Sequence, residues 1–547
     1  MSFRVVGCIL AAASLVALTG CDDDGDGAGG AGGTGGLAGS TTTTTGGAGG
    51  DGGTGGVVGS GAGGIGGTGT GGTGGMGAGG MGAGGMGGMG GMGTGGVGGT
   101  GTGGGGGALG CSLSVGAPQV AAIDGAWYGY AARDPLTGGV WRYGRFDGNV
   151  TIHGNNVVPA GGHDFYAVRY DAMFVPQIVD TFGSATSSFE LARGLAARST
   201  GGAVFQGNTN SFTYPGGSSI QGNHLIAVDA AGSETMARSF ISDGASGATQ
   251  EITVDGNGDI IVTQAAQHGL IIFGGSCSFT ATSGNKALAV AKFSGTTGDC
   301  QWLYAVESSA QTLEVNDITV DSAGDVAVIG SVNAAIDLGG GVLTPTLGDA
   351  FVLKVDGATG GYDSGRLIGG AQFQHGEAIQ ALGTDLAVVV HSAGANHTVD
   401  FGAGAVSCGT SFTCLGVARY DASLSSTTYA QLHQANLVTT RPVEASFRGD
   451  GSAVIAATYN GIGVMVGGVC PLPSFAGDQT HGMIVATDST GAVVAADAYE
   501  ASNIPIARSV DASASEAYVL FDAFQFASAT INFGGTLASG TSFLLKL

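Results

Sequence analysis

Positive charge is scarce in this sequence. The 547 residues include 17 Lys and Arg against 41 Asp and Glu, which gives a formal net charge of −24. Because an acidic, lysine-poor protein repels phosphate backbones, we predict no nucleic-acid partner. Charged residues make up only 11 % of the chain and hydrophobic residues 43 %, so wholesale disorder is not indicated and a core can form.

Sequence motifs of familiar catalytic and metal sites are also missing. Residues 111–547 contain no G-x-S-x-G, and the chain has no G-x-x-x-x-G-K-[ST] and no H-E-x-x-H. No C-x-x-C occurs and no His stands at ligand spacing from a Cys pair, which disfavours zinc. The histidines nearest to a cluster are His375, close to Glu377, and His391, close to His397, and we expect them in turns or at the surface. We therefore predict no metal, no cofactor and no catalytic residue.

The N-terminus has the features of an export signal. Arg4 precedes an apolar stretch, residues 5–17, that is too short to span a bilayer as a helix. The end of this stretch, Leu18-Thr19-Gly20-Cys21, resembles the lipobox of bacterial lipoproteins. That resemblance implies a signal peptide over residues 1–20 and a Cys21 thiol that carries diacylglycerol, so that acyl chains anchor the protein to a membrane. The alternative is an ordinary secretory signal with an incidental cysteine.

A glycine-rich segment follows the predicted lipidation site. Residues 21–110 consist mostly of Gly, Thr, Ala, Ser and Met, as in "GGTGGMGAGGMGAGGMGG". Such a segment has no periodic apolar face, and the backbone entropy of glycine opposes folding, so we predict a disordered tether. About 86 residues of such a chain reach roughly 50 Å. Its methionines could be taken for a copper(I) site, but apolar residues scattered through a tether are the better explanation.

Residues 111–547 have the pattern of an all-β domain built from repeats. The strand "AFVLKVD", which ends at Asp356, has counterparts ending at Asp171, Asp229, Ser294, Asp421 and Asp488, 58 to 67 residues apart. A second element, "DITVDSAGDVAVIGS", and a third, a glycine turn such as "IDLGGG", recur in phase with it. Each unit therefore reads as four strands separated by Asp- and Gly-containing turns, in about 62 residues.

Repetition at this period predicts a β-propeller or a solenoid. Residues 111–547 hold about seven units, and a four-stranded unit must cover both of its faces by packing on neighbours. The chain stops at "SFLLKL" without the partner strand that follows it elsewhere, and residues 138–147, around Trp141, resemble that partner. We therefore predict a seven-bladed propeller whose last blade is completed by residues 138–147, because closure removes the exposed sheet edge. Residues 126–137 leave an eighth, partial blade as the alternative.

The stretch "DITVDSAGDVAVIGS…DAFVLKVD" is similar to the SBBP-type bacterial β-propeller repeat. Together, the lipobox, the tether and these repeats resemble cell-surface lipoproteins of myxobacteria. The resemblance implies export to the outer membrane or cell surface of a Gram-negative bacterium. It implies no catalytic residues.

One position in the repeat is basic in five units. It lies two residues before the strand end and includes three of the four lysines in the chain. One interpretation is a basic ring for an anionic ligand. The other is a side chain that lies along apolar surface and pairs with a turn carboxylate such as Asp321 or Asp255. The residues are Arg169, Lys292, Lys354, Arg419 and Lys546.

Six cysteines beyond Cys21 suggest disulfides in an exported domain. Cys408 and Cys414 are close enough to pair across one hairpin loop, and Cys277 and Cys300 share a unit. Cys111 and Cys470 remain. Fifteen pairings are formally possible, so the connectivity stays open.

Two classes of function remain open for the propeller. The first is a non-enzymatic binding or display module for an unknown protein or glycan. The second is an enzyme, a glycan lyase or hydrolase, with its site in the central channel. The similarity of the units favours the first. Three or more Asp, Glu, His or Arg side chains on the ring axis would favour the second, and small apolar residues there would count against it.

Overall fold

The structure is a computed structural model, and it describes Cys111, Leu113 and most of residues 118–547. Every regular element in this part of the chain is a strand, so none of the described elements is a helix that could cross a membrane. The predicted signal peptide, Cys21 and the tether lie outside the described residues. Within residues 118–547 the short segments left out are 185–189, 214–218, 243–249, 267–269, 276, 395–397, 410–412, 436, 438–441, 461–463, 473–474, 476–479, 524–528 and 534–535.

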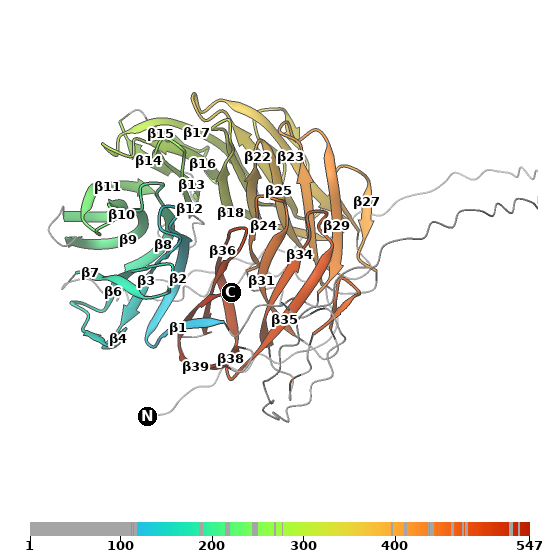
Figure 1. Cartoon of the computed structure of the whole chain (residues 1–547). Coiled ribbons are helices and arrows are strands. Elements are labelled where there is room, and N and C mark those ends of the chain that lie inside the picture. Colours follow the sequence, from blue (N-terminus) through green and yellow to red (C-terminus); the bar gives the residue numbers. More distant parts are fainter. Residues whose placement is uncertain are drawn as a thin grey trace, which may run out of the picture. The chain divides into compact units, whose positions relative to one another are not determined.

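Seven four-stranded antiparallel sheets follow one another around a ring, which confirms the predicted seven-bladed propeller (Figure 1). The inner strands of blades one to seven are β2 (Ala126–Arg133), β8 (Glu190–Ala197), β12 (Gln250–Val254), β18 (Leu313–Val320), β24 (Phe373–Leu382), β30 (Glu444–Phe447) and β36 (Pro505–Ala512). The second strands are β3 (Val140–Asp147), β9 (Ala203–Thr213), β13 (Ile260–Ala266), β19 (Val326–Val332), β25 (Asp385–Ala393), β31 (Ala453–Asn460) and β37 (Ala517–Ala523).

The third strands carry the repeated motif, and the outer strands complete each blade. The third strands are β6 (His163–Tyr170), β10 (Ser219–Val228), β16 (Lys286–Phe293), β22 (Asp349–Val355), β28 (Thr413–Tyr420), β34 (Thr480–Thr487) and β40 (Ser542–Lys546). The outer strands are β7 (Pro176–Gly183), β11 (Glu234–Ser242), β17 (Cys300–Ser308), β23 (Tyr362–Gly370), β29 (Thr427–Gln434), β35 (Val493–Ala501) and, in the seventh blade, β1 (Gln119–Ile123).

The ring is closed by a strand other than the predicted one. β1 pairs with β40, from Gln119 opposite Lys546 to Ile123 opposite Ser542, and Figure 1 shows it beside the C-terminal strands. Residues 138–147 instead contain β3, the second strand of the first blade, so the prediction for them was wrong. The burial pattern explains this, because all of β3 except its last residue is buried, as a central strand requires, whereas β1 is partly exposed like an edge strand.

No eighth blade is present among the described residues. Residues 126–137, the candidate for it, contain β2, which is the inner strand of the first blade. The first blade is therefore complete without any segment from the C-terminus.

The predicted glycine turns belong to hairpins that join neighbouring blades. In four blades the connection between the second and third strands pairs with the outer strand of the preceding blade, which extends that sheet to six strands. The hairpins are β14 (Leu270–Gly274) with β15 (Cys277–Thr280), β20 (Ile336–Asp337) with β21 (Val342–Leu343), β26 (Thr398–Asp400) with β27 (Ala405–Ser407), and β38 (Ala529–Phe533) with β39 (Thr536–Gly540). Two further hairpins form sheets of their own: β4 (Val150–Ile152) with β5 (Asn155–Val157), and β32 (Met465–Val466) with β33 (Cys470–Pro471).

The core lies between the blades. The second and third strands are buried on both faces, and every residue of Val326–Val332 and Asp349–Val355 is buried. Continuous apolar runs such as "VAVIGSV" follow from this arrangement, because each face of a blade packs against the next blade.

Candidate functional site

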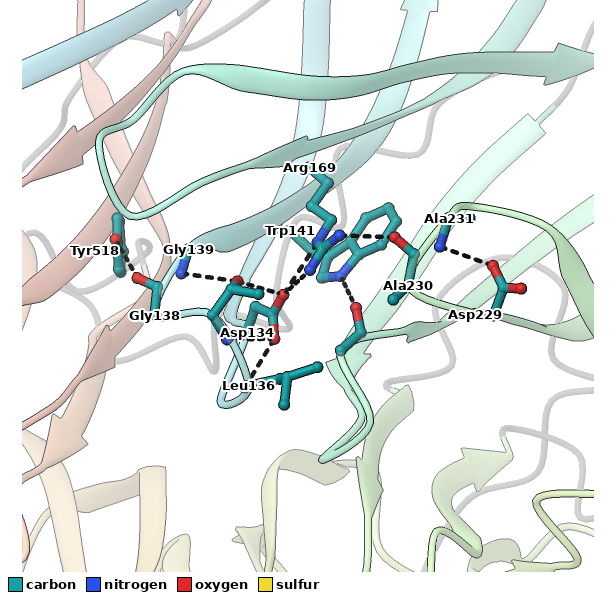
Figure 2. A network of polar contacts seen from close by, with 12 residues as sticks. Asp134, Leu136, Gly138, Gly139, Trp141, Arg169, Asp229, Ala230, Ala231 and Tyr518 are labelled. Atoms are coloured by element: carbon teal, nitrogen blue, oxygen red, sulfur yellow. Dashed lines mark hydrogen bonds and ion pairs between the residues drawn. The ribbon is translucent and has the colours of Figure 1, made fainter.

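The five predicted basic side chains are paired with carboxylates of the fold, so they do not form a ring that is open to an anionic ligand. In the first blade, Arg169 forms an ion pair with Asp134 of the turn between β2 and β3, at 2.6 Å. Its Nη1 donates to the carbonyl of Ala230 in the second blade, at 2.7 Å (Figure 2). Trp141 makes a parallel contact, donating through Nε1 to the carbonyl of Gly201, also in the second blade. The guanidinium therefore joins two consecutive blades.

The lysines make the same kind of contact. Lys354 is 3.0 Å from Asp321 and 3.1 Å from Asp325, and it donates to the carbonyl of Ala422 in the fifth blade. Its side chain is only 4 % exposed, so the charge is satisfied inside the fold. The remaining pairs are Lys292 with Asp255 and Gly357, Arg419 with Asp385, and Lys546 with Glu516 and Ala172.

Two blades without a basic third-strand residue carry an arginine in the turn instead. Arg198 of the second blade donates to the carbonyl of Gly295 in the third. Arg448 of the sixth blade donates to the carbonyl of Ser513 in the seventh, at 2.9 Å. Neither arginine was predicted from the sequence, although "AARST" and "SFRGD" align Arg198 and Arg448 with the turn aspartates of other units. Among the described residues, six of the seven blades thus send at least one cationic side chain to a carbonyl of the next blade.

The six cysteines of the domain form three pairs in the structure. Cys277 pairs with Cys300, and Cys408 with Cys414. The third pair joins Cys111, ahead of β1, to Cys470 in β33.

The axis of the ring contains a cavity of about 420 Å³ that all seven inner strands line. Six ionisable side chains on its wall carry opposite charges in two groups, and Tyr130 from β2 adds a hydroxyl. None of them was predicted from the sequence, although Glu251, Asp317 and Glu444 share one repeated position, three residues before the end of their inner strands. The six are Arg193, Glu251, Asp317, Glu377, Glu444 and Arg508.

β-bulges position several of these side chains. In β8, β18, β24 and β36 the pairing with the second strand skips one residue, and each skipped residue lines the cavity. A bulge turns a strand locally and re-aims one side chain, and bulges recur beside functional sites. The skipped residues are Arg193, Asn316, Glu377 and Arg508.

Carboxyl groups on one side of the cavity resist ionisation. Burial raises the pKa of Glu251 well above its usual range, and the charges of Asp317 and Glu444 raise it further. Burial together with Asp317 and Glu377 does the same to the pKa of Glu444, and Arg508 opposes the rise. Within the described part of the chain, neither Glu251 nor Glu444 has a side-chain hydrogen bond or ion pair.

Asp317 differs from its neighbours because the backbone holds its carboxyl group. It accepts hydrogen bonds from the amides of Ile318 and of Ile379 in β24, both at 2.7 Å. Burial nevertheless raises the pKa of Asp317 to about 7, while these two hydrogen bonds oppose the rise. Asp317 therefore joins β18 to β24 as well as lining the cavity.

The opposite side of the cavity is basic. The Nε of Arg508 is 3.1 Å from the buried carboxylate of Asp522. Its guanidinium lies over the ring of Tyr128, 4.9 Å from the centroid, and Arg145 lies over the same ring at 4.4 Å. Tyr128 has a positive φ of 51° within the bulge of β2, a conformation that costs energy for a non-glycine residue and recurs at functional sites.

The hydroxyl of Tyr130 interacts with both groups of charges. Burial and the charge of Glu251 raise its pKa, Arg193 and Arg508 lower it, and Glu444 raises it. Tyr130 and these four charged residues all line the same axial cavity, so both groups of charges face one space.

Two histidines border this site, contrary to the expectation that they lie in turns or at the surface. His375 in β24 and His391 in β25 are cross-strand partners, with their rings stacked at 5.7 Å. His391 is 1 % exposed, and its Nδ1 is 3.3 Å from Glu377. The continuous apolar run before His391 in "DLAVVVHSA" could have shown that this histidine belongs to a buried strand, whereas "FQHGEAIQAL" has no regular alternation that marks His375. No group of three or more His, Cys, Asp and Glu that could hold a metal occurs among the described residues.

No protein-family model matches the chain. No curated protein matches it significantly either. Among solved structures, it is similar to the quinohemoprotein alcohol dehydrogenase ADHIIG of Pseudomonas putida HK5, with 10 % identity and a TM-score of 0.31 over 78 % of this chain and 76 % of that one. It is also similar to the N11 neuraminidase-like protein of A/flat-faced bat/Peru/033/2010, with 9 % identity and a TM-score of 0.32 over 82 % and 93 % of the two chains. Likenesses this distant say nothing about what the chain binds or catalyses.

Proposed function

We propose that this chain is an exported lipoprotein, anchored through Cys21 at the outer membrane or cell surface, whose propeller binds a small polar ligand in its axial cavity. The observation that carries the binding role is the cavity itself. All seven inner strands line it, and four of them place a bulged residue on its wall. A volume of about 420 Å³ is in the ordinary range for small-molecule sites.

Two features indicate that the axial side chains form a binding site and do not serve only to fill the centre of the ring. Glu251 and Glu444 are half-buried, and their carboxyl groups have no partner among the described residues, at a cost in stability. The basic positions of the repeat, by contrast, are paired within the fold. The axial glutamates are therefore available to pair with a charged ligand, whereas the basic repeat residues are not.

A thermal-shift screen of the purified full chain in detergent tests the binding role. The panel holds sugars, polyamines, organic acids and amino acids. We expect at least one compound to raise the melting temperature of the wild type, and Glu444→Gln to reduce that shift at least five-fold. Glu500→Gln, which changes an exposed glutamate on β35, is the matched control. Ligands that stabilise both variants as well as the wild type would place the site elsewhere.

The anchor is tested separately. Cys21→Ala should move the protein from the membrane fraction to the soluble fraction and abolish its labelling by a fatty-acid probe. Protease treatment of whole cells should then degrade the wild-type protein if the propeller is displayed at the surface. Full protection in intact cells would contradict surface display.

A glycan hydrolase or lyase with its site in the axis is the second candidate. Six Asp, Glu and Arg side chains line the axis, the arrangement that favours an enzyme. Burial raises the pKa of Asp317 to about 7, so this group is partly protonated at neutral pH. Glycosidases combine a protonated carboxyl group with an ionised one. Release of reducing ends from a polysaccharide panel, lost in Asp317→Asn, would support this activity. Binding of a glycan without any release would contradict it.

A further inference from the structure

The charges around the axial cavity are segregated by blade. The third, fourth, fifth and sixth blades contribute Glu251, Asp317, Glu377 and Glu444. The seventh and second blades contribute Arg508 and Arg193, with Tyr130 of the first blade between them. Because the ring is closed, blades seven, one and two are neighbours. The cavity wall is therefore acidic along one arc and basic along the other.

We propose that the cavity binds a small zwitterion of the amino-acid and short-peptide class, with its ammonium group against the acidic arc and its carboxylate against the arginines. This inference rests on the proposed binding function and names its ligand class. A primary ammonium group supplies three donors for carboxylates, and a planar guanidinium suits a carboxylate group. A ligand with only one of these charges would contact only one of the two arcs.

The acidic arc is suited to bind a cation, because Glu251 and Glu444 have no cationic partner among the described residues. Glu251 and Glu444 repel each other and Asp317, and no side chain of the described residues neutralises them within ion-pair distance. An ammonium group placed between them would relieve this repulsion and lower both pKa values. Protons bound to the glutamates in the free protein would therefore leave when the ligand binds.

The basic arc is organised for an anion. Arg508 is held from two sides, by the carboxylate of Asp522 and by the ring of Tyr128. Its Nε is committed to Asp522, so the hydrogen bond leaves the two terminal nitrogens of the guanidinium for another acceptor. A guanidinium fixed in this way loses little freedom when it binds a carboxylate, which favours affinity.

Isothermal titration calorimetry on the full chain in detergent provides the test. The probes are the twenty L-amino acids and the dipeptide Ala-Ala, each beside its N-acetyl and C-amide derivative. We expect at least one free zwitterion to bind, and both derivatives of it to bind at least ten-fold more weakly. Titrations at pH 6.5 in two buffers of different ionisation enthalpy should show proton release on binding.

Isosteric variants assign the two ends of the ligand. Glu251→Gln and Glu444→Gln should weaken binding and reduce proton release, and Arg508→Lys should weaken binding without changing proton release. Glu500→Gln is the control. If the C-amide binds as tightly as the free acid, or only a sugar or polyamine binds, the zwitterion proposal is wrong although the cavity still binds a ligand. If no compound of this panel or of the thermal-shift panel binds, the proposed function itself is wrong.

Discussion

Lys354 shows what a single repeated side chain contributes to the fold. Its ammonium group is near two turn carboxylates and donates to a carbonyl of the following blade, while its side chain is 4 % exposed. Pairing with Asp321 and Asp325 raises its pKa above the usual value even though burial alone would lower it. Removal of this charge leaves two turn carboxylates without their cation.

We therefore expect Lys354→Met to lower the free energy of unfolding by about 3–5 kcal/mol, the usual cost of breaking a buried ion pair. Lys286→Met, at a partly exposed lysine in the third blade, should cost much less, about 1 kcal/mol or less. Urea unfolding followed by tryptophan fluorescence measures both. Equal effects of the two substitutions would show that the buried pair does not stabilise the ring.

The axial glutamates should make stability depend on pH. A carboxyl group whose folded pKa is raised binds its proton more tightly in the folded state, so it favours folding at low pH and disfavours it as pH rises through the folded pKa. Asp317, Glu377, Arg193, Arg508 and Tyr130 are the charged and titratable groups that share the cavity with Glu251 and Glu444.

Glu444→Gln removes one such group without changing its size. We expect the melting temperature of the variant to rise relative to that of the wild type between pH 5 and pH 8. In unfolding free energy, the gain is about 1.4 kcal/mol for each unit by which the pKa of Glu444 is raised. Histidines with lowered pKa values, such as His224 at about 4, act in the opposite direction in both proteins and cancel in the comparison. Melting curves at each pH test this, and a gain that is constant with pH would contradict it.

At the scale of single strands, the bulges decide which residues reach the axis. In β8 the bulge at Arg193 lets Leu191 and Ala192 stay buried while Arg193 lines the cavity. Because side chains alternate along a strand, removal of one residue would turn one half of the strand to the opposite face.

Deletion of Arg193 should therefore cost more than about 3 kcal/mol of unfolding free energy, because buried side chains of β8 would lose their packing. Arg193→Ala keeps the bulge and should cost about 1 kcal/mol. Comparison of the two melting temperatures is the measurement. A deletion no worse than the alanine substitution would show that β8 does not need the bulge.

The repeat could be found from sequence only where the units resemble one another. The third strands recur because their buried faces and their cation–turn pairs are the same in most blades, so Lys292 and Lys354 stood out. Only part of the axial site could be found in this way. Glu251, Asp317 and Glu444 share one repeated position of the inner strand. The bulged position holds Asn316, Glu377 or Arg508, and a bulge leaves no mark in composition.

The sequence predicted that the ring closes through an N-terminal strand, but it did not identify which strand closes it. The strand that closes it, "QVAAI", pairs through its backbone and carries no repeat signature, whereas Trp141 drew attention to β3. The aromatic side chain marks the contact between the first and second blades instead, where its indole donates to Gly201.

Deletion of residues 119–123 should open the ring. Ile123 is 1 % exposed, and loss of one buried isoleucine side chain alone costs about 2–5 kcal/mol. β40 would then become an unprotected edge that can pair with another chain. We expect a lower melting temperature and association that size-exclusion chromatography detects. Gln119→Ala, which keeps the backbone of β1 and changes an exposed side chain, is the control. A deletion variant that stays monomeric with the wild-type melting temperature would mean that the ring does not depend on β1 for its closure.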